Sequence, residues 1–447
     1  MKKKMTIRNG KVLLPEGLKT VNIEIENGVF SNITGQTNNA EAGTVINAQG
    51  KYVLPGFIDV HTNGINGFDL TNGVYDLETG KFNSDKDAYL DGLNNALIEY
   101  AKTGVTRVVL TSLASPIEQL KKVFNYVNKY KENHSNSSWK GVLEGLFVEG
   151  TFMKLIDYRG AHNPEYFYEP SIKLFNELQE AAGGLIKVVN VVPEWDELAF
   201  KLIKYLSQKK IVCAAGHTGA IGFQYDKAIK SGLRLAVHFL NGPTGSSSKS
   251  LDGGGAVENV LRAKNMYVEI IVDGYHVDKA YVMDTIKRKG FDKVCAITDS
   301  MFTASFKELR NFNILGVSGI VSENGEYLQI ADREYSLFGS MLTMDNAFSN
   351  VLTWLTIPIE GIWHVMHDPL EFEDALIKTS TLCSKNPAKI LGIYQPDSKQ
   401  NKDSLKNFTG SIEKGKSADL IVADIEKLDD SYKLKIENVF VKGYQVS

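Results

Sequence analysis

The sequence predicts an α/β protein in which a (β/α)8 TIM barrel is joined to a small β-sandwich built from both chain ends. Apolar, β-branched runs alternate with helical patterns through the middle of the chain, whereas short alternating segments occupy its two ends. A continuous apolar run is typical of a strand buried on both faces, and strand–helix alternation implies a parallel sheet. Eight such repeats favour closure into a barrel over an open, doubly wound sheet.

The chain ends are predicted to form antiparallel β-structure, with the turn signal Asn27-Gly28 between two of the strands. The short alternating segments are Thr6–Leu14, Val21–Glu26, Val29–Ile33, Leu420–Ala423 and Val439–Val441. Because the termini of a domain often lie close together, we expect residues 1–52 and 396–447 to form the small β-sandwich domain. Residues 53–395 are then expected to form the barrel domain.

The barrel is predicted from eight strand candidates and the helices between them. The strands are Val53–Val60, Val105–Thr111, Val142–Val148, Ile186–Val192, Ile211–Ala214, Leu233–Val237, Met266–Val272 and Lys293–Ile297. Apolar residues recur near the helical period of 3.6 in the intervening segments Ala88–Lys102, Ile117–Val127, Ile172–Ala181, Glu197–Leu206, Tyr225–Ser231 and Lys279–Arg288.

Other segments depart from this alternation. The residues Asn313–Ile330 contain the sequence ENGE at 323–326, which is a strong hairpin signal. Two further helices, Leu342–Leu355 and Leu370–Cys383, are expected to close the barrel. The segment Thr244–Gly255 is so rich in Gly and Ser that we expect no fixed element there.

Five apolar runs each end on a potential metal ligand or acid: FIDV-His61, GLFV-Glu149, CAAG-His217, RLAV-His238 and VCAIT-Asp299. A buried strand has no packing reason to end on an imidazole or a carboxylate, and barrel active sites lie at the carboxyl ends of the strands. For one histidine alone, a hydrogen-bonded core residue is the more common alternative. For the whole set we expect convergence on one site.

The expected site is a metal centre. Two imidazoles and one carboxylate, those of His217, His238 and Glu149, form a set that holds a metal and leaves positions open for water and substrate. Asp299 could accept a proton from the activated water. His61 is a candidate ligand of a second metal, and Asn63 follows it at a spacing that could point both side chains the same way.

Composition excludes several other classes of protein. The chain has 447 residues, 23% of them charged, and a net charge of -3, with basic residues scattered among acidic ones, so we expect no nucleic-acid partner. No apolar stretch approaches the roughly 20 residues of a membrane span, and the basic start has no apolar core of a signal peptide. Three cysteines without metal-binding spacing indicate reduced thiols and a cytoplasmic protein.

A series of motifs resembles one known family over nearly the whole chain. The motifs are PGFIDVHTNG (55–64), EG (149–150), GAHNP (160–164), PE (193–194), AGHT (215–218), VHFLN (237–241), DGYHVD (273–278), TDS (298–300), GSMLTM (339–344) and GSIEKGKSADLIV (410–422). The first is typical of the amidohydrolase superfamily. The order of the others is more specific and resembles the N-acetylglucosamine-6-phosphate deacetylases.

That resemblance implies a role for each matched residue. It implies Glu149, His217 and His238 as ligands of the main metal, Asp299 as the acid/base residue and His162 as the group that polarises the acetyl carbonyl. It also implies sugar-phosphate contacts, which fall on Asn241, Gly242 and His276. The family commonly forms a homodimer in which a basic loop residue reaches the neighbour's phosphate. That residue is often arginine, and the nearest match here is Lys249.

The resemblance implies hydrolysis of the N-acetyl group of an amino-sugar phosphate, with one divalent metal. Zinc suits the ligand set best, and iron, manganese or cobalt could also bind. A lysine bridge between two metals is not expected, because Lys187 lies at the start of its strand. The alternatives are another amidohydrolase, acting on an unphosphorylated or galacto-configured N-acetyl-hexosamine or on another N-acyl or cyclic amide, and a non-catalytic barrel scaffold.

Overall fold

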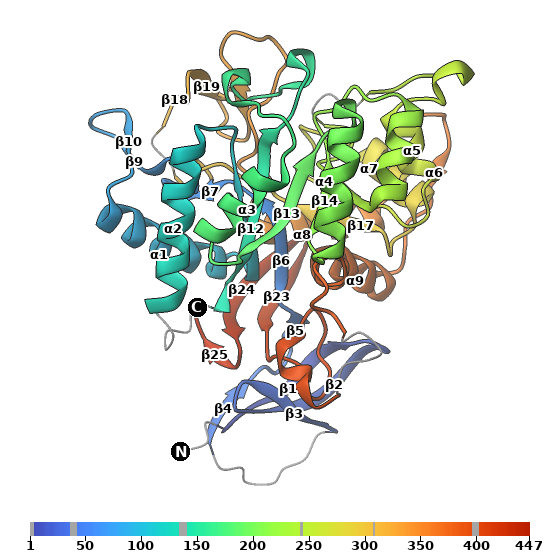
Figure 1. Cartoon of the computed structure of the whole chain (residues 1–447). Helices are drawn as coiled ribbons and strands as arrows, with labels where there is room; N and C mark the ends of the chain where they lie inside the picture. The colour runs from blue at the N-terminus through green and yellow to red at the C-terminus, as the bar shows by residue number, and fades with distance from the viewer. Residues whose placement is uncertain (1–3, 36–42, 134–140, 242–244, 307–308, 396–401) are drawn as a thin grey trace.

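The protein folds around an eight-stranded parallel sheet. The structure is a computed structural model that describes residues 4–35, 43–133, 141–241, 245–306, 309–395 and 402–447. The strands pair in the order β17-β16-β15-β14-β13-β12-β11-β6 (Figure 1). In chain order they are β6 (Phe57–Thr62), β11 (Val105–Ser112), β12 (Leu143–Phe152), β13 (Ile186–Val191), β14 (Val212–Ala215), β15 (Leu233–Ala236), β16 (Tyr267–Ile271) and β17 (Val294–Ile297). The predicted barrel strands are therefore confirmed, except that the first predicted strand is two separate strands.

The first and last strands close this sheet into a barrel. The Asp299 N–H donates to the His61 carbonyl over 2.9 Å. One residue earlier, the Thr298 hydroxyl donates to the Asp59 carboxylate over 2.5 Å. These bonds between β6 and the residues that follow β17 join the two edges of the sheet beside the site, at the end where a barrel carries its chemistry.

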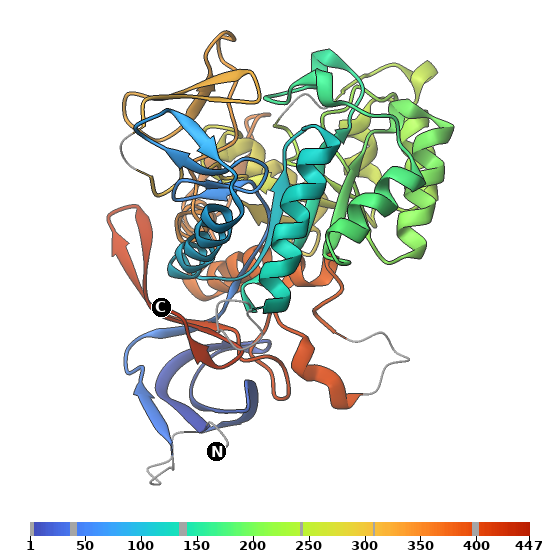
Figure 2. The same cartoon turned by 60° about the vertical axis from the view of Figure 1, so that its left-hand side comes forward.

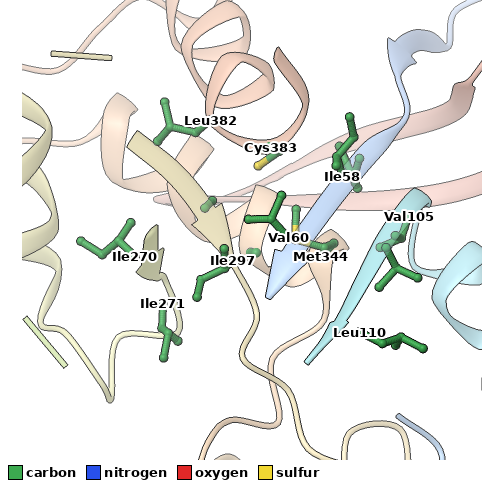
Figure 3. Close-up of a cluster of buried hydrophobic side chains, with 14 of the residues drawn as sticks. Ile58, Val60, Val105, Leu110, Ile270, Ile271, Ile297, Met344, Leu382 and Cys383 are labelled. Atoms are coloured by element: carbon green, nitrogen blue, oxygen red, sulfur yellow. The ribbon is translucent and has the colours of Figure 1, made fainter. Parts of the chain in front are cut away.

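Helices surround the barrel, as the repeating apolar patterns predict. They are α1 (Lys86–Lys102), α2 (Ile117–Asn133), α3 (Ile172–Ala181), α4 (Glu197–Gln208), α5 (Gly222–Ser231), α6 (Ala256–Arg262), α7 (Lys279–Lys289), α8 (Met344–Thr356), α9 (Phe372–Ser380) and α10 (Asn386–Ile390). Figure 3 shows Met344, Leu382 and Cys383 packed against the strands that carry Val60 and Ile297. The predicted helix Leu370–Cys383 is α9 followed by a π-helical turn, Thr381–Lys385.

Both chain ends contribute to a second sheet, which forms the small β-sandwich below the barrel in Figures 1 and 2. Its strands are β1 (Lys4–Leu14), β2 (Gly17–Glu26), β3 (Val29–Thr34), β4 (Thr44–Asn47), β5 (Tyr52–Pro55), β23 (Leu420–Leu428), β24 (Ser431–Val441) and β25 (Tyr444–Gln445). Apolar residues from both ends fill one core, among them Ile7, Phe30, Leu420 and Phe440. The C-terminal strands also reach the barrel, since the Leu434 N–H donates to the Ser349 hydroxyl of α8 over 3.0 Å.

The predicted strand Val53–Val60 is wrong as a single element. Its first half is β5, which pairs with β1 and β23 of the small sheet, and its second half belongs to β6 of the barrel. The small sheet therefore extends to Pro55. Gly56 separates the two strands, and a Cβ there would lie 2.2 Å from the Thr106 side chain. Both halves are buried, so they form one unbroken apolar run, and the sequence does not indicate where the chain passes from one sheet to the other.

Two small sheets lie at the end of the barrel away from the sandwich (Figure 1). One contains β18 (Asn311–Ile314), β19 (Val317–Val321) and β20 (Leu328–Ile330), so the hairpin predicted at residues 323–326 is confirmed. The other contains β7 (Gly64–Ile65), β8 (Phe68–Asp69), β9 (Gly73–Asp76) and β10 (Lys81–Asn83). A short separate hairpin pairs β21 (Ile359–Glu360) with β22 (Met366–His367).

The Gly/Ser-rich loop after β15 is more ordered than its composition predicts. Residues 242–244 lie outside the described residues, but the rest includes a 3-10 turn, Ser250–Asp252. The Glu258 carboxylate accepts hydrogen bonds from Ser246 and Ser247. The start of α6 therefore fixes this loop through side chains, which composition alone did not reveal. Within the described ranges, no helix is both long and apolar enough to cross a membrane.

Candidate metal centre and active site

Three of the predicted site residues occupy the same position relative to their strands. His217, His238 and Asp299 each lie two residues beyond the end of β14, β15 and β17. Each also has a positive φ, of 55°, 25° and 48° respectively. Non-glycine residues rarely adopt this conformation, which costs on the order of 1–3 kcal/mol, and such strain concentrates at functional sites. The fold thus bends three strand ends toward one point.

Glu149 completes this group from inside a strand. β12 continues to Phe152, so Glu149 does not end the third strand as predicted. Ligand atoms of Glu149, His217 and His238 all lie within 4.8 Å of one another, and all three residues are buried. Glu149 Oε1 is 3.5 Å from His217 Nε2 and 3.2 Å from His238 Nε2. The two imidazoles and one carboxylate therefore converge.

Hydrogen bonds to main-chain carbonyls orient both imidazoles of the group. His217 Nδ1 is 2.9 Å from the Tyr158 carbonyl, and His238 Nδ1 is 2.8 Å from the Asn241 carbonyl. A carbonyl can only accept, so each Nδ1 must carry the hydrogen and donate it. Each Nε2 then presents a lone pair to the centre of the group. This is the orientation that metal-binding histidines adopt.

The loop that carries His217 is fixed from the neighbouring strand. The Gly216 N–H donates to the Asn190 side chain over 3.0 Å. The Glu194 carboxylate accepts from the Thr218 hydroxyl over 2.7 Å and from the Gly219 N–H over 2.6 Å. Glu194 follows β13. The sequence placed it in a motif but did not indicate that its side chain holds the loop of His217.

The group needs a positive charge at its centre. His217 Nε2 and His238 Nε2 are 3.0 Å apart, which is too close for two lone pairs without a proton or cation between them. Burial lowers the pKa of His217 to about 4. Burial also opposes charge on His238, but the Glu149 carboxylate outweighs it and raises the His238 pKa. A divalent metal would replace that proton, and the donor set fits one.

His162 has the opposite hydrogen-bonding pattern. The Ala114 N–H donates to His162 Nδ1 over 3.1 Å, so Nδ1 is an acceptor. The hydrogen of the neutral ring is then on Nε2, which lies 3.6 Å from Glu149 Oε2 and lines the same cavity. His162 therefore presents an N–H donor to the cavity, where the two metal-ligand candidates present lone pairs.

Asp299 faces the metal-ligand group as a carboxylate. Its Oδ1 accepts a hydrogen bond from the Asn63 side chain over 2.8 Å and lies 3.3 Å from His61 Nε2. Burial would raise the pKa of Asp299, but the His61 charge outweighs burial and lowers it. A carboxylate held in this state can accept a proton at neutral pH.

His61 lies beneath the metal-ligand group and contacts three carboxylates. Its Nδ1 is 2.9 Å from Glu269, and its Nε2 is 3.4 Å from Glu149 and 3.3 Å from Asp299. Burial disfavours a charged ring, but the three carboxylates outweigh burial and raise the His61 pKa well above its ordinary value. Sequence reasoning missed Glu269, whose one signal was a carboxylate inside the apolar strand β16.

A cavity of about 520 Å³ opens over these residues. Asn241 and His276 line it, whereas Lys249 does not, and Gly242 lies outside the described residues. His276 Nδ1 is 2.6 Å from the Asp273 carboxylate, which fixes the ring. Its Nε2 is buried and has no partner among the described residues. That nitrogen is available to a bound molecule.

Comparison of the sequence with known proteins places the chain in a family. The sequence pattern of the amidohydrolase family matches residues 52–446. The N-acetylglucosamine-6-phosphate deacetylase of Bacillus subtilis is 26% identical over 415 residues, which cover 91% of this chain and 89% of that protein. The N-acetylgalactosamine-6-phosphate deacetylase of Escherichia coli O157:H7 is 24% identical and covers 90% of both chains.

Solved structures show the same fold. The N-acetylglucosamine-6-phosphate deacetylase of Pasteurella multocida superposes with a TM-score of 0.78 at 23% identity and covers 99% of both chains. A mutant of the corresponding Mycobacterium smegmatis deacetylase, in complex with N-acetyl-D-glucosamine-6-phosphate, superposes with a TM-score of 0.75 at 21% identity. That alignment covers 100% of this chain and 99% of the other.

Proposed function

Because the chain belongs to the amidohydrolase family, we propose that it is a metal-dependent deacetylase that hydrolyses N-acetylglucosamine 6-phosphate to glucosamine 6-phosphate and acetate. One observation carries the proposal. A single cavity holds a metal-ligand group, an N–H donor on His162 and the carboxylate of Asp299. Amide hydrolysis needs these three elements: an activated water, a donor for the oxyanion and a proton carrier.

The metal-ligand role is assigned to Glu149, His217 and His238. A divalent metal bound there would lower the pKa of a water to about 7 in favourable cases. The three residues supply one negative charge and two lone pairs, and they leave the cavity side open to water and substrate. Zinc suits this set best among the candidate metals.

Asp299 is assigned the proton transfer. As the water oxygen bonds to the acetyl carbonyl carbon, Asp299 takes the water proton. It then delivers that proton to the nitrogen as the C–N bond breaks, because an amine anion is too poor a leaving group. Asn63 holds the carboxylate in place through Oδ1, which leaves Oδ2 for the proton.

His162 is assigned the stabilisation of the oxyanion. The carbonyl oxygen gains negative charge when water adds to the carbon, and His162 Nε2–H is the neutral donor that faces the cavity. The bond from the Ala114 N–H to Nδ1 keeps the hydrogen on Nε2. A donor fixed in advance needs no reorganisation during the reaction.

Asn241 and His276 are assigned the hydrogen bonds to the sugar phosphate. Both line the cavity. The Asn241 carbonyl also holds His238, so substrate binding and metal binding share this loop. Gly242 and Lys249 follow on the same loop, and a role for Lys249 would require it to act on a neighbouring chain. A second metal at His61 would have to displace the proton that three carboxylates favour there.

Cysteine burial supports the predicted cytoplasmic location, and exposed apolar side chains support the predicted homodimer. All three cysteines are buried and unpaired, which fits a reducing cytoplasm. Two exposed apolar side chains, Leu251 on the loop after β15 (93% exposed) and Phe223 at the start of α5 (52%), fit a surface that a second copy covers. Light scattering at working concentration should give the mass of a homodimer, and a monomer mass would contradict that part of the proposal.

The decisive test is acetate release from four acetylated sugars. Purified enzyme loaded with zinc should be offered N-acetylglucosamine and N-acetylgalactosamine, each with and without the 6-phosphate. We expect the highest kcat/KM with N-acetylglucosamine 6-phosphate and release at least about 10²-fold slower by the Asp299→Asn variant. Preference for the galacto sugar would redirect the substrate assignment, and no acetate from any of the four would overturn the proposed function.

A further inference from the structure

The loop after β12 carries three groups that meet at the active site. The Tyr158 carbonyl accepts the Nδ1 hydrogen of His217 over 2.9 Å. A Cβ on Gly160 would lie 2.6 Å from the His217 ring, so the backbone of Gly160 packs directly on a metal-ligand candidate. His162, whose Nε2–H faces the cavity, follows two residues later. The placement of this loop therefore decides where the oxyanion donor lies relative to the metal-ligand group.

The same loop contacts the β18–β20 sheet at three points. Arg333, which follows β20, donates from Nη1 to the Gly160 carbonyl over 2.9 Å. The Asn163 side chain donates over 3.0 Å to the carbonyl of Leu315, in the turn between β18 and β19. Between these two bonds, Ala161 packs against the buried apolar cluster to which the strands of this sheet contribute. The sheet and the segment after it thus hold the loop in place.

The Arg333 bond is the strongest of these polar contacts and the closest to the reaction. A hydrogen bond from a charged donor contributes about 1.5–3 kcal/mol, against about 0.5–1.5 kcal/mol for a neutral pair such as Asn163 and Leu315. The carbonyl that Arg333 meets lies in a tight turn, because the His162 N–H donates to the Arg159 carbonyl over 3.0 Å. A shift of this turn would therefore move His162.

His217 has supports that are independent of Arg333. Asn190 and Glu194 hold the loop of His217 from the β13 side. The ring of His162 is held through the hydrogen bond to its Nδ1, and its Nε2–H is left for the cavity. Loss of the Arg333 bond should therefore displace the oxyanion donor and leave the metal-ligand group in place.

We propose that Arg333 is a positioning residue for the deacetylation, which holds the loop after β12 so that the His162 Nε2–H meets the developing oxyanion. The inference rests on the proposed function and deepens it. In this role Arg333 contacts no reacting atom and acts through the Gly160 carbonyl. Its effect falls on kcat rather than on KM, because an oxyanion donor acts in the transition state.

The first test compares variants of Arg333 with N-acetylglucosamine 6-phosphate at saturating zinc. Arg333→Met removes the donor, Arg333→Lys keeps a charged donor, and Arg234→Met is the control at an exposed position on β15. A displacement of about 1 Å can cost about 100-fold, so we expect kcat of Arg333→Met to fall about 10- to 100-fold. KM should stay within about twofold of wild type, and Arg333→Lys should lose less.

Three results of these measurements would overturn the proposal. They are an unchanged kcat in Arg333→Met, a raised KM at wild-type kcat, and equal losses in Arg333→Met and Arg333→Lys. The first would show that the bond does not matter for turnover. The second would make Arg333 a substrate-binding residue, and the third would show that the donor is not what counts. Arg234→Met should match wild type in both constants.

A double-mutant cycle shows whether Arg333 acts through His162. In the His162→Asn background the donor is already absent, so Arg333→Met should lower kcat further by less than about threefold. A further loss as large as in the wild-type background would place the effect elsewhere and overturn the proposal. Metal content of dialysed Arg333→Met should equal that of wild type. A loss of metal would mean that Arg333 acts through His217, which would also overturn it.

Hydrogen exchange tests the loop without turnover. Peptides that cover residues 155–168 should exchange faster in Arg333→Met than in wild type and Arg234→Met, because a loop that loses a tether opens more often. Peptides that cover β14 and β15 should be unchanged. Equal exchange of the loop in all three proteins would overturn the proposal. If wild-type enzyme releases acetate from none of the sugars, the proposed function fails, and the exchange result still decides whether Arg333 fixes this loop.

Discussion

His217 and His238 present Nε2 to each other at 3.0 Å, and each directs Nδ1 at a main-chain carbonyl. Main-chain bonds thus commit both rings to offering lone pairs at one point, beside the Glu149 carboxylate. His162, on the same cavity, has its Nδ1 occupied by a main-chain N–H and offers a hydrogen instead. The backbone therefore leaves two histidines with lone pairs that could bind a metal and a third with a hydrogen to donate.

Glu149→Gln should lose the metal. The amide keeps the size of the side chain but removes the negative charge that balances the cation. Changes to residues that only support metal ligands cost about 10- to 100-fold in affinity, and we expect a ligand substitution to cost more. Metal content of the dialysed protein measures the effect, with exposed Glu426→Gln as control. A full equivalent of metal in Glu149→Gln would count against Glu149 as a ligand.

Asp299→Asn should keep the metal and lose turnover. Asparagine preserves an oxygen for the Asn63 hydrogen bond but cannot accept and return a proton. General acid–base catalysis contributes about 10²- to 10⁴-fold, and we expect kcat to fall within or beyond that range at unchanged metal content. Near-normal kcat would remove Asp299 as the proton carrier.

Two substitutions at His162 separate donation from packing. Asparagine can accept the Ala114 N–H in place of Nδ1 but has no group at the position of Nε2, so His162→Asn should lower kcat about 10²- to 10³-fold. Glutamine places an N–H near Nε2, and His162→Gln should recover part of that loss. Equal activity of the two variants would show that the Nε2 donor does not serve catalysis.

Asp59 should make the protein less stable as pH rises toward neutrality. Burial raises its pKa to about 7, against hydrogen bonds from Thr298 and the His61 N–H. At pH values between about 4, the pKa of an aspartate in the unfolded chain, and about 7, its pKa in the folded state, the folded protein keeps a proton on Asp59 that the unfolded chain has lost. The free energy of unfolding therefore falls as pH rises through this range. The loss of unfolding free energy is at most about 4 kcal/mol, and it levels off above pH 7.

Asp59→Asn isolates that contribution. Asparagine cannot ionise, so the variant should lose less stability than wild type between pH 5 and pH 8, an interval that spans the folded pKa of Asp59. Urea unfolding at the two pH values measures the difference. Parallel losses in both proteins would mean that Asp59 does not titrate in this range. Glu426→Gln, at an exposed position, serves as the control.

The sequence predicted the barrel well because its signals are local. Each parallel strand is buried on both faces, so it reads as an apolar run, and the site residues directly follow or end those runs. His217, His238 and Asp299 could thus be found by position. The prediction of the first strand was wrong for the same reason. Val53 and Ile58 are equally buried, so both belong to one apolar run although they lie in different sheets.

What could not be predicted depends on tertiary contacts. Glu269 sits within β16 and acts on His61, a residue 208 positions away in sequence. Arg333, which follows β20, lines the cavity and donates to the Gly160 carbonyl. The tautomers of the histidines also depend on which main-chain group each ring meets, and no spacing in the sequence reports that.

Anomalous X-ray diffraction on metal-loaded crystals tests the central claim most directly. We predict one strong peak at the absorption edge of the bound metal, with His217 Nε2, His238 Nε2 and a Glu149 oxygen each about 2.0–2.2 Å away, as for zinc. A peak elsewhere, or a metal whose ligands exclude these three side chains, would contradict the account.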